Sequence, residues 1–425
     1  MELAAILASG LQASYIAYGL GRSYGDAPLN REGGVITPIR LNRFLAFDPQ
    51  TGVLECEAGT SLAEILQSFL PRGFFPPVTP GTKFVTVGGA IAADVHGKNH
   101  HKDGTFSRFV LDFQLLTPEG ERLLCSPTQH SEIFWATAGG MGLTGILLSA
   151  RIQLRRVESA YVLVDYQKAR DLSEALALMA ESDERYQYSV AWIDCLAAGA
   201  KRGRAVLMRG DHAPAAQLPS KIRSPLAGLH KAQWNVPFNL PSFALNRWSV
   251  GLFNALYYGW HKDAPKRLVD YESFFYPLDA LHHWNRLYGR RGFVQYQLAL
   301  PLEDGARGLE AVLKCLAEAR RASFLGVLKR FGEADPAPLS FPLKGYTLAL
   351  DLPVTRDLVP FLHELDRRVL EHGGRVYLAK DAALEAGSFR SMYPRLESFQ
   401  AIKRKLDPRG LLSSSQARRL KIVET

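Results

Sequence analysis

The segment 80–101, PGTKFVTVGGAIAADVHGKNHH, places three glycines just before a run of polar side chains. Glycine has no Cβ, so a backbone can approach a ligand closely there, and successive free N–H groups can bind phosphate oxygens. His96 and Lys98 follow on the same segment. This order predicts a phosphate-bearing cofactor beside a reacting centre, although a tight loop followed by solvated polar residues gives a similar pattern.

Two more glycine-rich segments lie before residue 150. Residues 18–26 read YGLGRSYGD after a short strand-like run, and residues 134–146 read FWATAGGMGLTGI. Three such segments predict one extended phosphate-bearing ligand that the protein binds along its length. None of them is a G-x-G-x-x-G motif that opens a helix of a βαβ unit, and no Walker A lysine is present, so a Rossmann fingerprint and a P-loop are not indicated.

These motifs recur in a known order. GLGRSYGD, VTVGGAIA, HGKNHH, FWATAGG, QYQ and AKD follow one another from about Gly19 to the C-terminus. In this the chain resembles flavoproteins of the vanillyl-alcohol oxidase class, which share their FAD-binding fold with p-cresol methylhydroxylase. Within that class it is similar to the decaprenylphosphoryl-β-D-ribose 2′-oxidase family. The resemblance covers nearly the whole chain, and HGKNHH and AKD are its most specific motifs.

The elements that must position these motifs fall into three parts, which predict an α+β fold. Residues 1–158 alternate strand-like runs with helical pieces, one of which begins with a capping box of Ser61 and Glu64. They are expected to form the N-terminal part of an FAD-binding domain. Residues 159–374 mix β-rich segments and helices, which favours an antiparallel sheet with helices on one face as the substrate domain. By resemblance, residues 375–425 return to complete the FAD-binding domain.

Composition is typical of a globular enzyme. The chain has 425 residues, 47% of them hydrophobic, and a formal net charge of +9. Its four cysteines are scattered without a C-x-x-C pair, which argues against a metal site and against disulfides. No apolar run is long enough for a transmembrane helix, and the N-terminus lacks the basic region of a signal peptide. A cytoplasmic protein, or one peripheral on the inner membrane, is expected.

Basic and aromatic residues concentrate in residues 196–267, which carry eleven Lys or Arg and two acids. Proline-containing runs at 214–219 and 224–225 indicate irregular loop within this stretch. Basic residues mixed with large apolar groups favour peripheral contact with an anionic membrane or with a lipid phosphate. A loop that packs its own aromatics over the substrate domain is the alternative. Nucleic acid is not expected, because no nucleic-acid-binding motif accompanies the charge.

A flavin that oxidises an alcohol takes a hydride while a base accepts the hydroxyl proton. By resemblance, Lys380 is the leading catalytic candidate, with His96 as its rival for the base, and Lys98 and Tyr24 lie in the same pocket. Arg22 stands where some relatives carry a flavin-linked histidine, which predicts noncovalent FAD. The residues implied to bind the cofactor are Gly19, Gly21, Arg22, Ser23, Tyr24, Pro80, Gly81, Thr82, Thr86, Gly88, Gly89, Ala92, Ala93, Asp94, His96, Asn99, His100, Gly140, Gly142, Thr144, Ile146, Tyr377 and Lys380.

The implied substrate-binding residues lie in the second part of the chain. Alternation along a strand places Gln295 and Gln297 on one face, which by resemblance points to the flavin. Lys329 would meet a phosphate, and Trp192 would stack on a sugar. Each also fits an ordinary strand position. The set is Trp192, Gln295, Gln297, Lys329, Thr347 and Ala349, of which the last two stand where mycobacterial members have Asn and Cys.

The resemblance implies an FAD-dependent oxidase that converts the 2′-hydroxyl of a polyprenyl-phosphoryl pentose, of the decaprenylphosphoryl-β-D-ribose type, to the 2′-keto sugar. This step is the first half of an epimerisation to the arabinose form for cell-envelope glycan synthesis. A keto-sugar reductase is then an expected partner and a quinone a plausible electron acceptor. The alternatives are a soluble sugar or polyol oxidase that uses oxygen, and a non-catalytic flavin-holding scaffold subunit, whose expected mark would be loss of Lys380 or His96.

Overall fold

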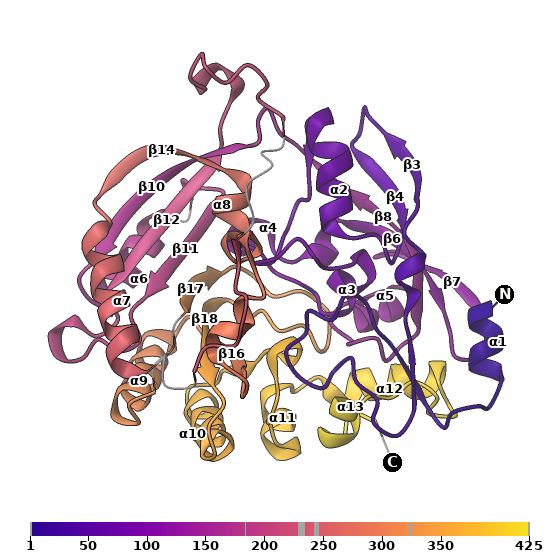
Figure 1. Cartoon of the computed structure of the whole chain (residues 1–425). Coiled ribbons are helices and arrows are strands. Elements are labelled where there is room, and N and C mark those ends of the chain that lie inside the picture. Colours follow the sequence, from indigo (N-terminus) through magenta and orange to yellow (C-terminus); the bar gives the residue numbers. More distant parts are fainter. Residues whose placement is uncertain are drawn as a thin grey trace.

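The computed structural model describes residues 2–182, 184–227, 234–241, 246–321, 323 and 325–423. Parts of the basic stretch, 228–233 and 242–245, therefore lie outside the described residues. Two antiparallel sheets stand side by side, each covered by helices (Figure 1). The antiparallel sheets and helices confirm the predicted α+β class. No helix of the described part is long and apolar enough to cross a bilayer.

The first sheet belongs to the glycine-rich half of the chain. Its strands run in the order β3 (Phe44–Asp48), β4 (Val53–Glu57), β8 (Ile146–Gln153), β6 (Val110–Leu116) and β7 (Arg122–Cys125). Neighbouring strands are all antiparallel. Helices α2 (Leu62–Phe69), α3 (Val87–Ala92) and α5 (Ser131–Thr137) belong to the same half. The predicted capping box is present, because the side chains of Ser61 and Glu64 each accept the other's backbone N–H.

The second sheet has eight strands. Their order is β14 (Ala264–Asp270), β10 (Tyr161–Ala169), β12 (Ala205–His212), β11 (Tyr188–Ile193), β17 (Gly326–Phe331), β18 (Gly345–Pro353), β16 (Phe293–Pro301) and β19 (Arg375–Val376). Alternate residues such as Leu298, Leu348 and Leu350 are fully buried in one core with apolar residues of α9 (Gly305–Glu318) and α10 (Leu358–Glu371). The residues between them therefore point to the opposite face, which helices α9 and α10 leave uncovered.

The C-terminal helices return to the glycine-rich half. They are α11 (Ala386–Met392), α12 (Leu396–Leu406) and α13 (Ser415–Arg419). Helix α12 packs against α5, and α13 places Arg419 on the carboxylate of Asp26. At the other end of the chain, α1 (Glu2–Ala8) leads to β1 (Tyr15–Ala17), which pairs in parallel with β2 (Gly34–Ile36). Residues separated by nearly 400 positions thus pack together.

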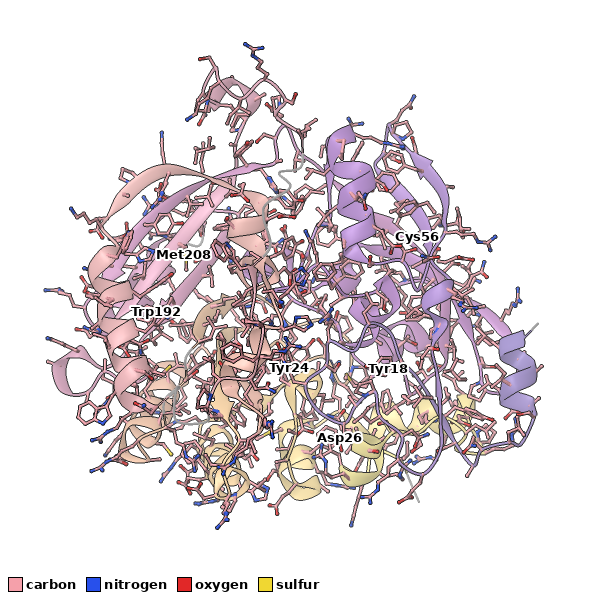
Figure 2. All side chains as sticks on the ribbon, in the orientation of Figure 1. Tyr18, Tyr24, Asp26, Cys56, Trp192 and Met208 are labelled. Atoms are coloured by element: carbon pink, nitrogen blue, oxygen red, sulfur yellow. The ribbon has the colours of Figure 1, made fainter. Side chains whose placement is uncertain are left out.

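Helices α6 (Leu172–Ser182), α7 (Arg247–Trp260) and α8 (Tyr271–Phe275) complete the second half, with the short α4 (His100–Asp103) between the two sheets (Figure 1). Four two-residue strands form the pairs β5 (Phe74–Phe75) with β9 (Arg155–Arg156) and β13 (Trp234–Asn235) with β15 (Leu281–His282). Figure 2 places Tyr24 between the two sheets and Trp192 and Met208 within the second. The space between the sheets is where the sequence motifs of both halves meet.

Candidate active site

One row of side chains crosses four strands of the second sheet on its uncovered face. Trp192 pairs with Val327, Val327 pairs with Ala349, and Ala349 pairs with Gln297. Residues that pair directly in an antiparallel sheet point to the same side. The sheet therefore brings three of the predicted substrate residues, from β11, β18 and β16, into one line, although they lie far apart in the sequence.

Gln297 joins this face to the HGKNHH segment. Its Nε2 lies 2.9 Å from His96 Nε2 and 3.1 Å from Thr347 Oγ1. When the amide donates to Nε2, the imidazole carries its proton on Nδ1, which is buried and has no partner among the described residues. Burial, with Lys329 as the nearest charged contributor, holds the pKa of His96 well below its usual value. His96 is thus a neutral imidazole with one free ring nitrogen in the site.

Three lysines, Lys98, Lys329 and Lys380, lie close enough to His96 or to one another to affect the pKa values of the site. Burial lowers the pKa of Lys98 to about 7, helped by Lys329, and lowers the pKa of Lys329 itself to about 8. The pKa of Lys380 falls to about 7, mainly through burial, with Lys329 acting in the same direction and Asp351 opposing it. A bound anion stabilises the charged form of such buried amines, which burial otherwise disfavours. The region is therefore suited to a phosphate.

Lys380 faces the first glycine loop. Its Nζ lies 3.8 Å from the centre of the Tyr24 ring, and the Tyr24 N–H donates to the carbonyl of Ala379 at 2.9 Å. Tyr24 also meets Phe293 edge to face, with ring centres 5.5 Å apart. The loop at 18–26 and the AKD motif, separated by more than 350 residues, thus form one wall. Lys380 and Tyr24 meet at this wall and His96 meets Gln297 of the second sheet, whereas the Lys98 ammonium donates to the carbonyl of Phe274 on α8.

Asp351 is a further residue of this site that the sequence motifs did not predict. This carboxylate is fully buried on β18 and accepts hydrogen bonds from Gln295 Nε2 at 2.7 Å and from the Tyr288 hydroxyl at 3.3 Å. Burial raises its pKa to about 6, against the opposing effects of Gln295 and Lys380. A signal was available, because alternation along the strand puts residue 351 on the same face as Thr347 and Ala349.

The glycine loops fit a phosphate-bearing cofactor. The N–H groups of Tyr18 and Tyr24 donate to the carbonyls of Ile36 and Ala379. The N–H groups of residues 19–23, which lie between these two tyrosines, have no backbone partner among the described residues. A Cβ on Gly19 would lie only 2.7 Å from Thr86 Oγ1. A side chain there would clash with Thr86, so glycine is needed for the two loops to pack this closely. Unpaired N–H groups on closely packed loops are what an anionic ligand requires. FAD fits this donor set.

Several residues predicted to bind the cofactor have side chains that are engaged inside the protein. The Asn99 amide donates to the carbonyl of Pro77 at 2.9 Å, and Gly332 N–H donates to His100 Nδ1 at 3.1 Å. The Thr144 hydroxyl lies 2.9 Å from that of Thr137, Ile146 is in the core, and Ser340 donates to Asp94. These side chains position the loops, and their contact with FAD stays a prediction.

Tyr377 and Arg22 each connect two of the motifs predicted to bind the cofactor. The Tyr377 hydroxyl donates to the carbonyl of Ala93 at 2.7 Å, and its ring stacks on Phe341 with centres 4.6 Å apart. Burial raises the Tyr377 pKa above its usual value. Arg22 is exposed, and its Nε donates to the carbonyl of Phe84 at 3.0 Å. Tyr377 therefore ties the C-terminal motif to α3, while Arg22 ties the first glycine loop to the second.

Comparison with known proteins agrees with this arrangement. Residues 2–126 match a family model described as FAD binding domain, and residues 287–420 match one described as D-arabinono-1,4-lactone oxidase. The chain is 41% identical over 411 residues to decaprenylphosphoryl-beta-D-ribose oxidase of Mycolicibacterium smegmatis, which covers 96% of this chain and 89% of that protein. An uncharacterized protein in the mprA 5′ region of Streptomyces coelicolor is 37% identical over 376 residues, 85% of this chain and 99% of its own length.

A more distant match is human Delta(24)-sterol reductase, 25% identical over 149 residues, which cover 35% of this chain and 29% of that protein. The matched domain and the glycine loops define the protein as an FAD-binding oxidoreductase. Within that class, the chain belongs to the decaprenylphosphoryl-β-D-ribose oxidase family. The predicted family, enzyme class and FAD cofactor are thereby confirmed.

Proposed function

We propose that this protein oxidises the 2′-hydroxyl of a polyprenyl-phosphoryl pentose, of the decaprenylphosphoryl-β-D-ribose type, to the 2′-keto sugar. The name of the mycobacterial relative supports this substrate. The observation that carries the proposal is the convergence of neutral His96 and the amines of Lys98, Lys329 and Lys380 opposite the glycine loops. A sugar phosphate supplies both the hydroxyl and the anion that such a set can bind.

Bound FAD would supply hydride acceptance, and the protein would supply binding, orientation and proton transfer. We assign the proton of the reacting hydroxyl to the amine of Lys380. With a pKa of about 7, a large fraction of this amine is neutral near pH 7, which suits a general base. His96 is the rival base, because its ring is neutral and its Nδ1 is buried without a partner in the described residues; it would accept at Nδ1 in the tautomer that carries the proton on Nε2, with the Gln297 amide oxygen facing that nitrogen.

The other residues bind and orient the substrate in this proposal. Gln295 and Gln297 lie on the same face of β16, where their amides can bond sugar hydroxyls. Lys329 and Lys98 hold the phosphate. Trp192 stacks on the sugar or on the first part of the lipid, and Thr347 and Ala349 line the floor beneath it.

The cofactor residues follow the three glycine loops. We assign Gly19 to Tyr24, Pro80 to Ala93 and Gly140 to Ile146 to the FAD site. Binding would be noncovalent, since the Arg22 side chain cannot form the flavin link that a histidine makes in some relatives. Residues 1–158 and 375–425 then form the FAD-binding domain, and residues 159–374 form the substrate domain. The packing of α12 on α5 supports this division.

The chemistry implies further partners. A 2′-keto sugar must be reduced to give the epimerised, arabinose-configured product, so a keto-sugar reductase would act next in cell-envelope glycan synthesis. Electrons must also leave the flavin, and a quinone would serve for a protein at the inner membrane. Peripheral membrane contact through residues 196–267 would bring the enzyme to both the lipid substrate and the quinone.

A soluble sugar or lactone oxidase that uses oxygen is the second candidate. The match of residues 287–420 to D-arabinono-1,4-lactone oxidase favours it. Anaerobic mixing of the FAD-loaded protein with polyprenyl-phosphoryl ribose separates the two. We expect the flavin absorbance to bleach with the lipid and not with free ribose or a free sugar lactone. Bleaching by the free sugars alone, with rapid peroxide formation in air, would establish the second candidate.

A further inference from the structure

Helix α7 carries a stripe of large apolar side chains that face solvent. Trp248, Leu252, Leu256 and Trp260 recur every four residues, which places them along one side of the helix. Their exposed fractions are 73%, 63%, 63% and 85%. Apolar residues at this spacing normally face a core, so a fully exposed stripe indicates a surface that binds something apolar.

The opposite side of α7 is fixed to the protein. Val250 and Asn254 are buried, and the Asn254 amide donates to Asp194 at 2.7 Å. The Tyr258 hydroxyl donates to the carbonyl of Ala169 at 3.3 Å, and its ring lies 4.1 Å below the Lys168 ammonium. The stripe is therefore held outward by contacts on the other face of the same helix.

Positive charge lies at both ends of the stripe. Arg247 is exposed beside Trp248, with its guanidinium 4.3 Å from the ring, and Lys262 is exposed just after Trp260. Within residues 246–267 the sole acid is Asp263, which accepts the backbone N–H of Lys168 at 2.9 Å. An apolar stripe with tryptophan at its two ends and flanking cations matches the interface of an anionic bilayer. A protein partner would more often be met by charges of both signs.

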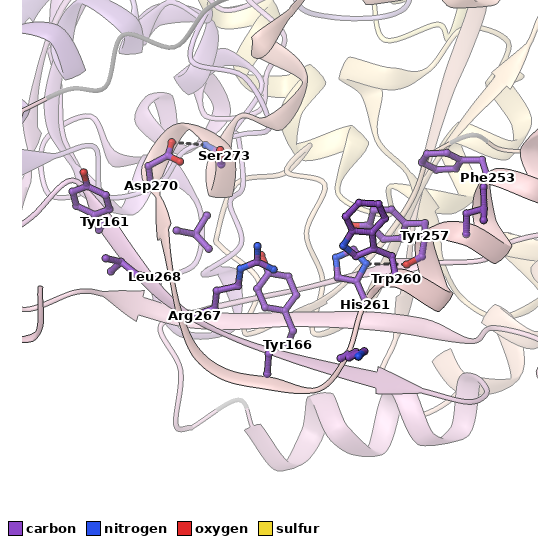
Figure 3. Close-up of a pocket in the computed structure, with 14 residues that line it drawn as sticks. Tyr161, Tyr166, Phe253, Tyr257, Trp260, His261, Arg267, Leu268, Asp270 and Ser273 are labelled. Carbon is purple, nitrogen blue, oxygen red and sulfur yellow. Dashed lines mark hydrogen bonds between the residues drawn. The ribbon is translucent and has the colours of Figure 1, made fainter. Parts of the chain in front are cut away.

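A cavity of about 1000 Å³ lies beside the C-terminal end of α7 (Figure 3), and Leu256 and Trp260 of the stripe also line it. Aromatic side chains from α7, among them Tyr257 and Trp260, face Tyr166 of β10 and Leu268 of β14 across it. Arg267 reaches the same space, with its guanidinium 5.7 Å from the Tyr166 ring centre. The lining is mainly aromatic and aliphatic, with the cations Lys262 and Arg267 and with Asp270, which accepts the Ser273 N–H at the start of α8; such a lining suits an aliphatic chain.

This cavity opens on the same face of the sheet as the active site. Tyr166 pairs with Met208 and Met208 with Val190, two residues before Trp192 on β11. The Trp192 ring lies 4.7 Å from that of Tyr257, which lines the cavity. Five strand spacings separate β10 from β16 in the sheet order, or roughly 24 Å. A pentose phosphate cannot span this distance, whereas its lipid chain can.

We propose that α7 docks on an anionic lipid bilayer and that the cavity beside it receives the apolar chain of the lipid substrate. The docking surface stands on the exposed stripe and its flanking charge. The role of the cavity rests in addition on the proposed function, because the chain it would hold belongs to that substrate. Trp192 and Tyr257 form the passage between the sugar site and the cavity.

Flotation of the full-length, FAD-loaded protein with vesicles tests the docking. We expect binding to phosphatidylcholine vesicles that contain phosphatidylglycerol, weakened by salt, and little binding to phosphatidylcholine alone. The double variant Leu252→Ser/Leu256→Ser should lower the partition coefficient by about 30-fold. The matched control Leu11→Ser/Leu29→Ser removes two leucines that are 76% and 50% exposed elsewhere and should leave binding unchanged.

Brominated phosphatidylglycerol gives a second readout, since insertion of Trp248 and Trp260 should quench tryptophan fluorescence in the wild type and the control but not in the double variant. Equal binding by all three proteins would overturn the docking surface. So would dimerisation without lipid that the double variant abolishes, because the stripe would then bind a second copy of this chain.

Ala264→Trp tests the cavity. Ala264 lines it and pairs with Tyr166 on the neighbouring strand, so an indole there would fill the space. Binding of a dansyl-labelled polyprenyl phosphate should weaken at least tenfold, while the control Ala200→Trp on an exposed turn should bind as the wild type does. Unchanged binding by the cavity variant would refute this role. If the wild type binds the dansyl-labelled lipid but the sugar-bearing lipid does not bleach its flavin, the proposed function would be refuted and the cavity would keep its role in lipid binding.

Discussion

Replacement of Asp351 by asparagine should stabilise the protein, and more so at higher pH. The carboxylate is 0% exposed and its pKa is raised from 3.8 to about 6, first by burial. An acid whose pKa is higher in the folded than in the unfolded protein does not lower the free energy of unfolding at a pH where it is protonated in both states. The cost grows as pH rises through the window between the two values and is complete above the folded pKa.

This difference corresponds to about 3 kcal/mol at pH 8 and about 0.5 kcal/mol at pH 4. Asparagine keeps the shape of the protonated acid and removes the charge. For a chain of 425 residues, 3 kcal/mol amounts to a rise in melting temperature of about 3 °C. Differential scanning calorimetry of wild type and Asp351→Asn between pH 4 and pH 8 measures this directly.

Asp48→Asn is the matched control. Asp48 is exposed, and hydrogen bonds, first from the Thr51 hydroxyl, lower its pKa. A lowered pKa gives stability that is present above the unfolded value, so this variant should lose stability at pH 8. A gain for Asp351→Asn that does not change with pH, or a loss at pH 8, would refute the assignment of Asp351 as a strained buried carboxylate. The same carboxylate raises the pKa of Lys380 against the effect of burial, so it contributes to a pKa of about 7 for that amine.

Three further outcomes are expected. Lys380→Met should lower kcat by roughly 10²–10⁴-fold with FAD still bound, and Lys380→Arg should not restore it, because a guanidinium cannot accept a proton near pH 7; an unchanged kcat would assign the proton to the histidine. Ala349→Cys should gain one iodoacetamide adduct by mass spectrometry, whereas Leu348→Cys, fully buried on the other face, should gain none; equal labelling would contradict the strand orientation. Lys403→Met should cost about 3–5 kcal/mol, measured by denaturation, because it leaves the buried carboxylate of Asp407 without its cation. The exposed Lys405→Met should cost under about 1 kcal/mol, and a similar loss in both variants would contradict the argument.

Much of the site could be predicted because its motifs are local. Strand alternation alone predicts that Gln295 and Gln297 share a face. The glycine loops are recognised from their composition. Asp351 was missed because its partner Tyr288 lies 63 residues away, and only the pairing of β18 with β16 brings the two together. Strand alternation puts residue 351 on the face of the site, but it does not show which residues bond the carboxylate.

Helix α7 was missed for another reason. The prediction for residues 196–267 rested on charge and aromatic content, and the prolines at 214–219 and 224–225 indicated irregular loop within the stretch. The spacing of Trp248, Leu252, Leu256 and Trp260 was visible and predicts a helix. What the spacing could not supply is the side that faces the protein, since Val250 and Asn254 are not more apolar than the exposed stripe. That side is set by the tertiary partner Asp194.

The lysines of the site explain why its electrostatics favour one kind of ligand. The folded pKa values of Lys98 and Lys329 are about 7 and about 8, whereas an unfolded chain holds these protons up to about 10.5. Each amine therefore destabilises the fold at and below pH 7, and the cost declines only as pH rises toward 10.5. A phosphate bound among them would restore their charge and reverse that cost, so the free energy given up in folding becomes available for binding. Neutral apolar ligands could not do this, so the charges of the site support the proposed arrangement, with the sugar phosphate among the lysines and the lipid chain beyond Trp192.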